Sequence, residues 1–165
     1  MPDRFPVGVF TKRWLDYDLE NLWYGTDGFN AGYSFASVVQ LVNNATDGSD
    51  LAVYEIVPWV SSYPKLAMWR VEQALAVAFT SNVYPLVDGN PAIPGTVVHS
   101  NPDAAFYTSN YYLLLADARP YRRPGGAPIA IISPGRGLSV WPVNSENTPA
   151  TNAQMLCTFV WGRYS

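Results

Sequence analysis

The chain has 165 residues and a mass of 18.2 kDa, which is the size of one ordinary domain and needs no metal ion or disulfide bond to hold its core. Its formal net charge is only −3, which argues against nucleic acid as a partner. No apolar run approaches the roughly 20 residues that cross a bilayer, so we expect no membrane partner. The first residues lack the pattern of a signal peptide.

The first 32 residues predict an arm. Pro2 and Pro6 favour an extended start. Residues 11–24 carry apolar side chains at helical spacing, with Thr11 as a possible cap and Gly25 as a possible end. The same segment would also suit an extended stretch that wraps around a neighbour. We therefore expect an arm over residues 1–32, extended or partly helical, and one β-rich domain over residues 33–165.

The rest of the chain predicts short strands in close succession, because scattered Pro and Gly separate segments rich in β-branched and aromatic residues. The total is about eight strands, which is typical of an antiparallel β-sandwich or a jelly-roll-like fold. The fold class is all-β. The clearest strand segments are residues 33–42, 51–58, 68–79, 106–116, 129–133, 137–143 and 153–163.

Two of these assignments depend on particular patterns. Residues 43–50 (NNATDGSD) form a concentrated turn signal, which predicts that the strands on either side make a hairpin. Residues 68–79 fit both a helical face and strict alternation. The alternation places Trp69 and Val71 on one side and Arg70 and Glu72 on the other. We favour the strand, because neighbouring segments are strands.

Little in the sequence indicates catalysis. His99 is the only histidine and lies in a polar stretch, which we interpret as a loop after a short strand. Cys157 is the only cysteine and lies in an apolar strand, so a disulfide within the chain is excluded and a small buried side chain is expected. No G-x-S-x-G or phosphate-binding motif is present. We expect no enzyme activity, no cofactor and no metal site.

The composition instead favours contact with other proteins. Charged residues make up 14% of the chain and aromatic residues 15%, and interface cores are poor in charge and rich in aromatic residues and arginine. Eight of the ten basic residues are arginines. The basic turn Arg119–Arg123 contains Pro120, which lowers the entropy lost on docking. The candidate partner-binding residues are Phe5, Phe10, Trp14, Trp23, Arg119, Tyr121, Arg122 and Arg123.

Exposed tryptophans offer a different interpretation, because aromatic rings also stack on sugars. On this hypothesis the protein is a carbohydrate-binding module. Trp69 and Trp161 fall at core positions of strands, whereas Trp59, beside Pro58, is expected to be exposed. The candidates are Trp14, Trp23, Trp59, Trp69, Trp141 and Trp161.

Several segments resemble a known family. Residues 43–56 (NNATDGSDLAVYEI) are similar to a hairpin in small structural proteins of tailed bacteriophages, with Asn44 in place of the usual Pro and Glu55 in place of the usual Arg. Residues 131–140 and 155–161 resemble the family's Pro-Gly-x-Gly-Leu-x-Val and Phe-x-Trp ending. Residues 1–32 depart from the pattern. The resemblance implies an antiparallel β fold and a place in the virion.

From these observations we expect an auxiliary capsid protein that cements or decorates the surface of a phage head. Its partners would be the major capsid protein or other virion subunits, and it would form a homo-oligomer, with a trimer favoured. The alternatives are a tail, fibre or spike adaptor of the same virion and the carbohydrate-binding module.

Overall fold

The computed structural model describes residues 22–30, 37–61, 65–75, 79–80, 82–85, 94–101, 112–115, 117 and 119–164. Among them are eleven strands, a short 3-10 turn (Pro124–Gly126) and no α-helix. The strands are β1 (Leu22–Phe29), β2 (Val38–Val42), β3 (Asp50–Val60), β4 (Leu66–Gln73), β5 (Phe79–Thr80), β6 (Asn82–Pro85), β7 (Thr96–Ser100), β8 (Tyr112–Leu115), β9 (Ala130–Ile132), β10 (Arg136–Val143) and β11 (Met155–Tyr164).

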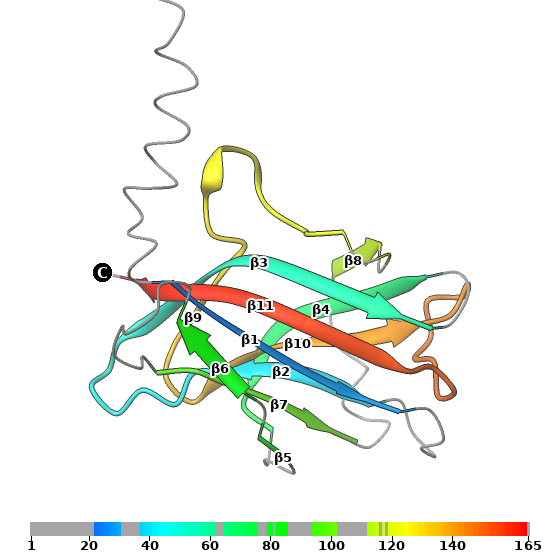
Figure 1. The fold of residues 1–165 in the computed structure, drawn as a ribbon, viewed down its shortest axis with the longest axis horizontal. Coiled ribbons are helices and arrows are strands. Elements are labelled where there is room, and N and C mark those ends of the chain that lie inside the picture. The colour runs from blue at the N-terminus through cyan, green and yellow to red at the C-terminus, as the bar shows by residue number, and fades with distance from the viewer. Residues whose placement is uncertain are drawn as a thin grey trace, which may run out of the picture.

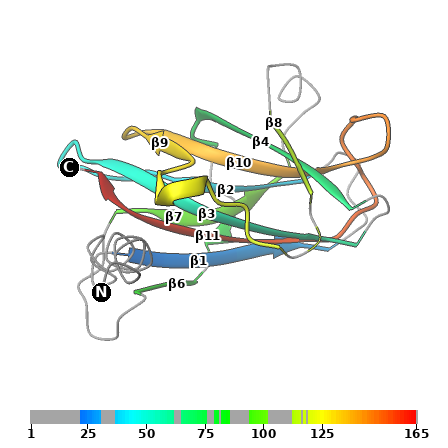
Figure 2. The same ribbon diagram turned by 90° about the horizontal axis from the view of Figure 1, so that it is seen from above.

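The strands form two antiparallel sheets that pack face to face (Figure 1). One sheet has the order β6-β1-β11-β3-β9 and the other the order β5-β7-β2-β10-β4-β8. Seen from above, β1 and β11 lie on one side and β10 and β4 on the other (Figure 2). The expected all-β sandwich is confirmed.

The strand order is that of a jelly roll. When β5, β6 and β7 are set aside, eight strands remain. In chain order, the first, eighth, third and sixth lie in one sheet, and the second, seventh, fourth and fifth lie in the other. The three additional strands form an insertion between β4 and β8. β6 extends one sheet beyond β1, and β7 extends the other beyond β2, so the insertion widens both sheets on the same side.

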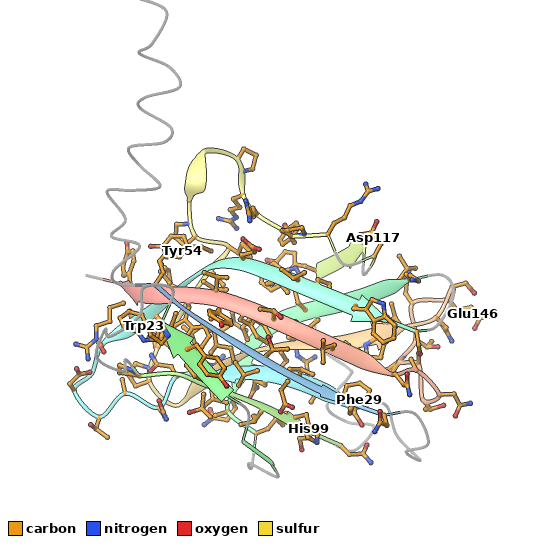
Figure 3. All side chains as sticks on the ribbon, viewed as in Figure 1. Trp23, Phe29, Tyr54, His99, Asp117 and Glu146 are labelled. Carbon is orange, nitrogen blue, oxygen red and sulfur yellow. The ribbon has the colours of Figure 1, made fainter. Side chains whose placement is uncertain are left out.

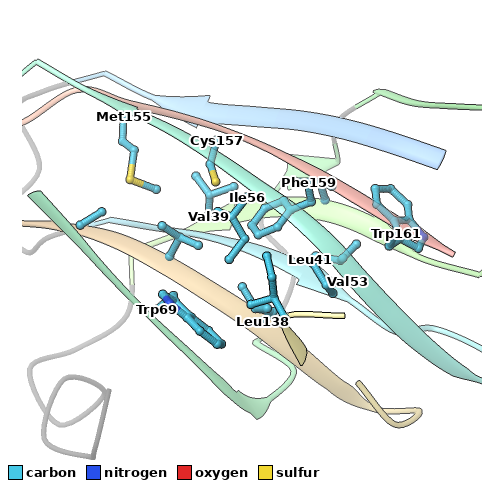
Figure 4. Packing of buried hydrophobic residues seen from close by; sticks show 14 of the residues in the cluster. Val39, Leu41, Val53, Ile56, Trp69, Leu138, Met155, Cys157, Phe159 and Trp161 are labelled. Carbon is cyan, nitrogen blue, oxygen red and sulfur yellow. The ribbon is translucent and has the colours of Figure 1, made fainter. Parts of the chain in front are cut away.

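The core lies between the sheets, and side-chain alternation fills it. Met155, Cys157, Phe159 and Trp161 occupy every second position of β11 and are buried there (Figure 4). Trp69 and Trp161 belong to this core, as the sequence predicted, and so does the thiol of Cys157. This cluster is the largest of three groups of buried apolar residues, and it stabilises a chain without disulfide bonds.

Strand β4 confirms the alternation expected for residues 68–79, although β4 ends at Gln73. Trp69 and Val71 pack into the core. Arg70 and Glu72 point to the other face, where they form an ion pair of 2.7 Å. The arginine also lies 5.2 Å from the ring centre of Trp141 on the neighbouring strand β10.

The predicted hairpin over residues 33–58 is wrong. Strands β2 and β3 lie in different sheets, so the turn-rich residues 43–49 carry the chain from one sheet to the other. Asn43 holds this crossing, because its side-chain amide donates to the carbonyls of Ser49 and Ile132. A turn signal shows that the chain reverses, but it does not tell whether the second strand pairs with the first.

The boundary of the arm at residue 32 is also wrong. Residues 22–29 are strand β1, which lies between β6 and β11 inside the sandwich. The possible helix over residues 11–24 therefore fails at its last three residues, and residues 11–21 lie outside the described part of the chain. The alternating side chains Trp23 and Phe29 enter the core, which requires an extended backbone there.

Candidate functional site

The basic segment predicted to contact a partner runs along the edge of β3. Strand β9 pairs with β3 only at Leu51–Val53, which leaves the remaining edge of β3 free for other backbone groups. Tyr121 takes part of it, because its backbone exchanges two hydrogen bonds of 2.7 and 3.1 Å with Ile56. Trp59 forms a further bridge with Asp117. Asp117 and Tyr121 thus both lie along the edge of the sandwich.

A β-bulge in β3 prepares this edge. The register between β3 and β11 shifts between Val160 and Trp161, so β3 accommodates one extra residue opposite that point. The side chains of Tyr54 and Glu55 consequently both point away from the core between the sheets, and Glu55 contacts the basic segment. Bulges commonly redirect side chains in this way.

Two contacts of unequal strength hold the basic side chains. Arg122 Nε lies 2.5 Å from Glu55 Oε2, and the Glu55 side chain is only 10% exposed. The Arg122 side chain is half exposed, but the buried carboxylate needs its cationic partner, so the pair ties the segment to β3. Arg119 Nε lies 3.1 Å from Asp117 Oδ2, but its side chain is 84% exposed, so the pair adds little to stability.

Aromatic packing also holds this segment against the sandwich. The Tyr121 ring lies 6.2 Å from the Trp69 ring, and Trp69 stacks on Tyr112 of β8 at 4.8 Å. Since Trp69 belongs to the core, the base of the segment is anchored to the body of the sandwich. Asp117, where the segment begins, lies beside strand β3 (Figure 3).

Beyond Arg122 the chain projects from the sandwich (Figure 1). Arg123 is exposed, and the turn Pro124–Gly126 follows it, with positive φ angles of 79° at Gly125 and 72° at Gly126. We call residues 119–126 the basic tip. It presents the exposed side chains of Arg119 and Arg123 from an anchored base, so four of the predicted partner-binding residues do lie together: Arg119, Tyr121, Arg122 and Arg123.

Trp23, another predicted contact residue, does not join them. Trp23 is 2% exposed and packs in the core, so it is not available to a partner, and its assignment is corrected. A tryptophan on a strand is buried when its side chain points toward the opposite sheet. The sequence did not reveal this alternation, because the neighbours Leu22 and Tyr24 are also apolar. Phe5, Phe10 and Trp14 lie outside the described residues.

A second surface feature is an open hollow of about 530 Å³ across the ends of β1, β11 and β3. Trp59 lines it and is 38% exposed, as the sequence suggested. Leu156, directly opposite Trp59 in the β3–β11 register, is 49% exposed. The polar groups around the hollow were missed by sequence analysis, because they become neighbours only when β1 and β11 pair.

His99 has a different setting from the loop that the sequence suggested. It lies in strand β7, and its Nδ1 is 2.8 Å from Asp27 Oδ2 of β1. The pair joins the two sheets on the side widened by the insertion. Both side chains are largely buried, so this is the contact of a satisfied structural histidine.

The described residues contain no group of three or more His, Cys, Asp and Glu side chains placed to hold a metal ion. Burial raises the pKa of the Cys157 thiol well above its ordinary value, so at neutral pH this sulfur is a protonated core atom and not a nucleophile. In the part of the chain that is described, no helix is long and apolar enough to span a membrane.

Comparison of the chain with protein-family models gave no match, and neither did comparison with curated proteins or with solved structures.

Proposed function

We propose that this protein is a structural protein of a bacteriophage particle, an auxiliary capsid protein that cements or decorates the head shell. The observation that carries the proposal is the basic tip, an arginine-rich segment that is held at the edge of β3 and ends in a projecting turn. The resemblance of residues 43–56, 131–140 and 155–161 to small phage structural proteins supports the virion as its location. Jelly rolls occur in viral capsid proteins, but the fold does not by itself decide a function.

The physical role of the tip would be adhesion. Because Tyr121 and the Arg122–Glu55 pair already hold its base, docking costs little additional backbone entropy. Arg119 and Arg123 would then meet carboxylate or aromatic groups of a shell subunit, which guanidinium groups recognise through forked and stacked contacts.

Repetition would make such a contact effective. An interface of standard size buries roughly 800 Å² on each partner. A homotrimer would present three tips at once, and each additional contact then forms at high effective concentration. The proposal therefore expects a trimer in solution, which light scattering coupled to size-exclusion chromatography measures.

The decisive experiment is binding of the purified protein to shells that lack it. The double substitution Arg119→Ala with Arg123→Ala should weaken loading by at least roughly tenfold, since one anchoring arginine commonly contributes more than about 1 kcal/mol. Arg163→Ala is the matched control, because Arg163 is half exposed and pairs with Asp47 away from the tip. Equal loading of the double variant and the control would show that the tip does not contribute to binding of the shell.

Image reconstruction of purified particles tests the location. Density on the outer surface of the head supports the cement or decoration role. Density on the tail would replace it with the adaptor role, and absence from every particle would overturn a virion function altogether.

A further inference from the structure

The hollow beside Trp59 is distinct from the basic tip in its chemistry. It is lined by uncharged residues apart from Asp27: Thr26, Asp27, Gly28, Phe29, Asn30, Trp59, Gln154, Met155 and Leu156. The carboxylate of Asp27 is already engaged, because it accepts from the Gly28 backbone at 2.8 Å and faces His99. The hollow therefore offers an indole ring and neutral polar groups.

Gly28 lets β11 and the Leu156 side chain lie close against β1 at this point. The outward positions along β1 and just past its end alternate Thr26, Gly28 and Asn30, and the glycine places no side chain between the other two. A Cβ at Gly28 would lie 2.5 Å from the Met155 carbonyl oxygen and 2.8 Å from Leu156 Cδ1. The position thus requires glycine, because the Met155 carbonyl and the Leu156 side chain occupy the space that a Cβ would take.

The polar groups surround an aromatic wall. Asn30 and Gln154 are both exposed, and each side-chain amide supplies two N–H donors and a carbonyl acceptor. Thr26 keeps its hydroxyl 2.7 Å from that of Thr158 on the neighbouring strand. Trp59 supplies a broad apolar face. A volume of about 530 Å³ falls within the range of small-molecule sites, which combine apolar walls with a few polar groups.

We infer that this hollow binds a pyranose ring of an oligosaccharide. A pyranose has an apolar C–H face, which suits the Trp59 indole, and a rim of hydroxyl groups, each both donor and acceptor, which suits the amides of Asn30 and Gln154. An aliphatic side chain would contact the indole and Leu156 but could not itself form hydrogen bonds with the amides, as the hydroxyl groups of a sugar can. The inference goes beyond the virion proposal and does not depend on it, because the basic tip plays no part in the hollow.

The test uses the full-length protein and a glycan array, followed by saturation-transfer NMR with the free methyl glycosides of the array's binding sugars at millimolar concentration. Trp59→Ala should lower the affinity at least tenfold, and Trp59→Phe should keep a measurable part of it. Asn30→Ala and Gln154→Ala should each weaken binding several-fold. Tyr84→Ala is the control, because Tyr84 is another exposed aromatic side chain of the same sheet but lies outside the hollow.

Each outcome is decisive. Loss of glycan binding in Trp59→Ala with retention in Tyr84→Ala supports the inference, provided that both variants unfold at temperatures near that of the wild type. The inference is overturned if the wild type binds no glycan, or if Trp59→Ala binds as well as the wild type. Reduced loading onto shells by Trp59→Ala without any glycan binding would identify the hollow as a protein contact instead, whereas failure of the tip variants alone bears only on the virion proposal.

Discussion

The carboxylate of Glu72 makes the stability of this fold depend on pH. It pairs with Arg70 on the outer face of β4. Burial raises the pKa of Glu72 above its ordinary value of 4.5, and this effect outweighs the opposing hydrogen bonds of Ser139 and Arg70 and the charge of Arg136. The folded protein therefore binds this proton more tightly than the unfolded chain does. The resulting contribution to stability is fully present below the unfolded pKa and is lost as the pH rises through the folded pKa.

Glu72→Gln should remove this pH dependence. The amide stays neutral, so the free energy of unfolding of the variant, relative to that of the wild type, should increase between about pH 4 and about pH 7. Urea denaturation at both pH values measures the difference. Glu146→Gln is the control, because Glu146 is exposed on the loop between β10 and β11. A constant difference across the pH range for Glu72→Gln would contradict the prediction.

Gly95 is a second residue whose surroundings restrict which amino acid can occupy its position. Its φ angle is 130°, and a Cβ there would lie 2.5 Å from Nε1 of Trp161, whose N–H donates to the Pro94 carbonyl at 3.2 Å. Gly95→Ala therefore combines backbone strain with a collision against the core indole. Gly48 also has a positive φ, 81°, but a Cβ at that position would meet no heavy atom within 4 Å.

The pair of glycines separates strain from collision. Gly48→Ala should cost about 1 kcal/mol, the strain alone. Gly95→Ala should cost about 1–3 kcal/mol more, which is the usual penalty of overpacking. Thermal and urea unfolding of the two variants measure the difference, and equal losses would show that Trp161 moves aside without cost.

At the level of the elements, strand β1 sets how many residues can be deleted from the start of the chain without loss of the fold. It lies between β6 and β11 and carries Trp23 into the core. A deletion that ends at residue 21 keeps every described strand, whereas a deletion through residue 29 removes a central strand and exposes the edge of β11. Unpaired strand edges promote aggregation.

We expect the shorter deletion to fold and the longer one to lose cooperative unfolding. Near-UV circular dichroism and thermal unfolding distinguish the two variants. If the deletion through residue 29 unfolds as cooperatively as the full chain, β1 is not part of the domain. The shorter variant also tests the proposed arm, because its loading onto shells can be compared with that of a folded full-length chain.

At the scale of the whole molecule, the first and last described strands are neighbours. β1 pairs with β11 along its full length, from Leu22 with Gly162 to Phe29 with Met155. Nearly the whole chain must be present before this pairing forms, and the closing of such long loops slows folding.

We therefore expect refolding from urea on the scale of milliseconds to seconds or slower, as for other all-β proteins dominated by distant pairings. Stopped-flow tryptophan fluorescence measures the rate. A truncation before Met155 provides the comparison, since it lacks the strand that β1 and β3 share and should not regain native fluorescence. Complete refolding within microseconds would contradict this view of the topology.

Local patterns determined a large part of this protein. Period-two alternation predicted that Trp69 and Val71 face the core and that Arg70 and Glu72 do not, because a strand between two sheets has only two faces. The low charge and the apolar neighbours of Cys157 likewise predicted its burial. The prolines and charges near Arg119 and Arg123 also predicted exposed side chains, although Tyr121 between them pairs with β3 and does not lie in a turn.

Only the tertiary structure decided which strands are partners. Turn residues 43–49 predict a reversal of the chain, but whether β3 pairs with β2 or crosses to the opposite sheet depends on where β10 and β11 are placed, and those strands come about a hundred residues later. For the same reason the sequence assigned Trp23 to an arm and could not bring Asn30, Trp59 and Gln154 together. Alternation is a local property of the backbone, whereas sheet order is set by burial of the whole core at once.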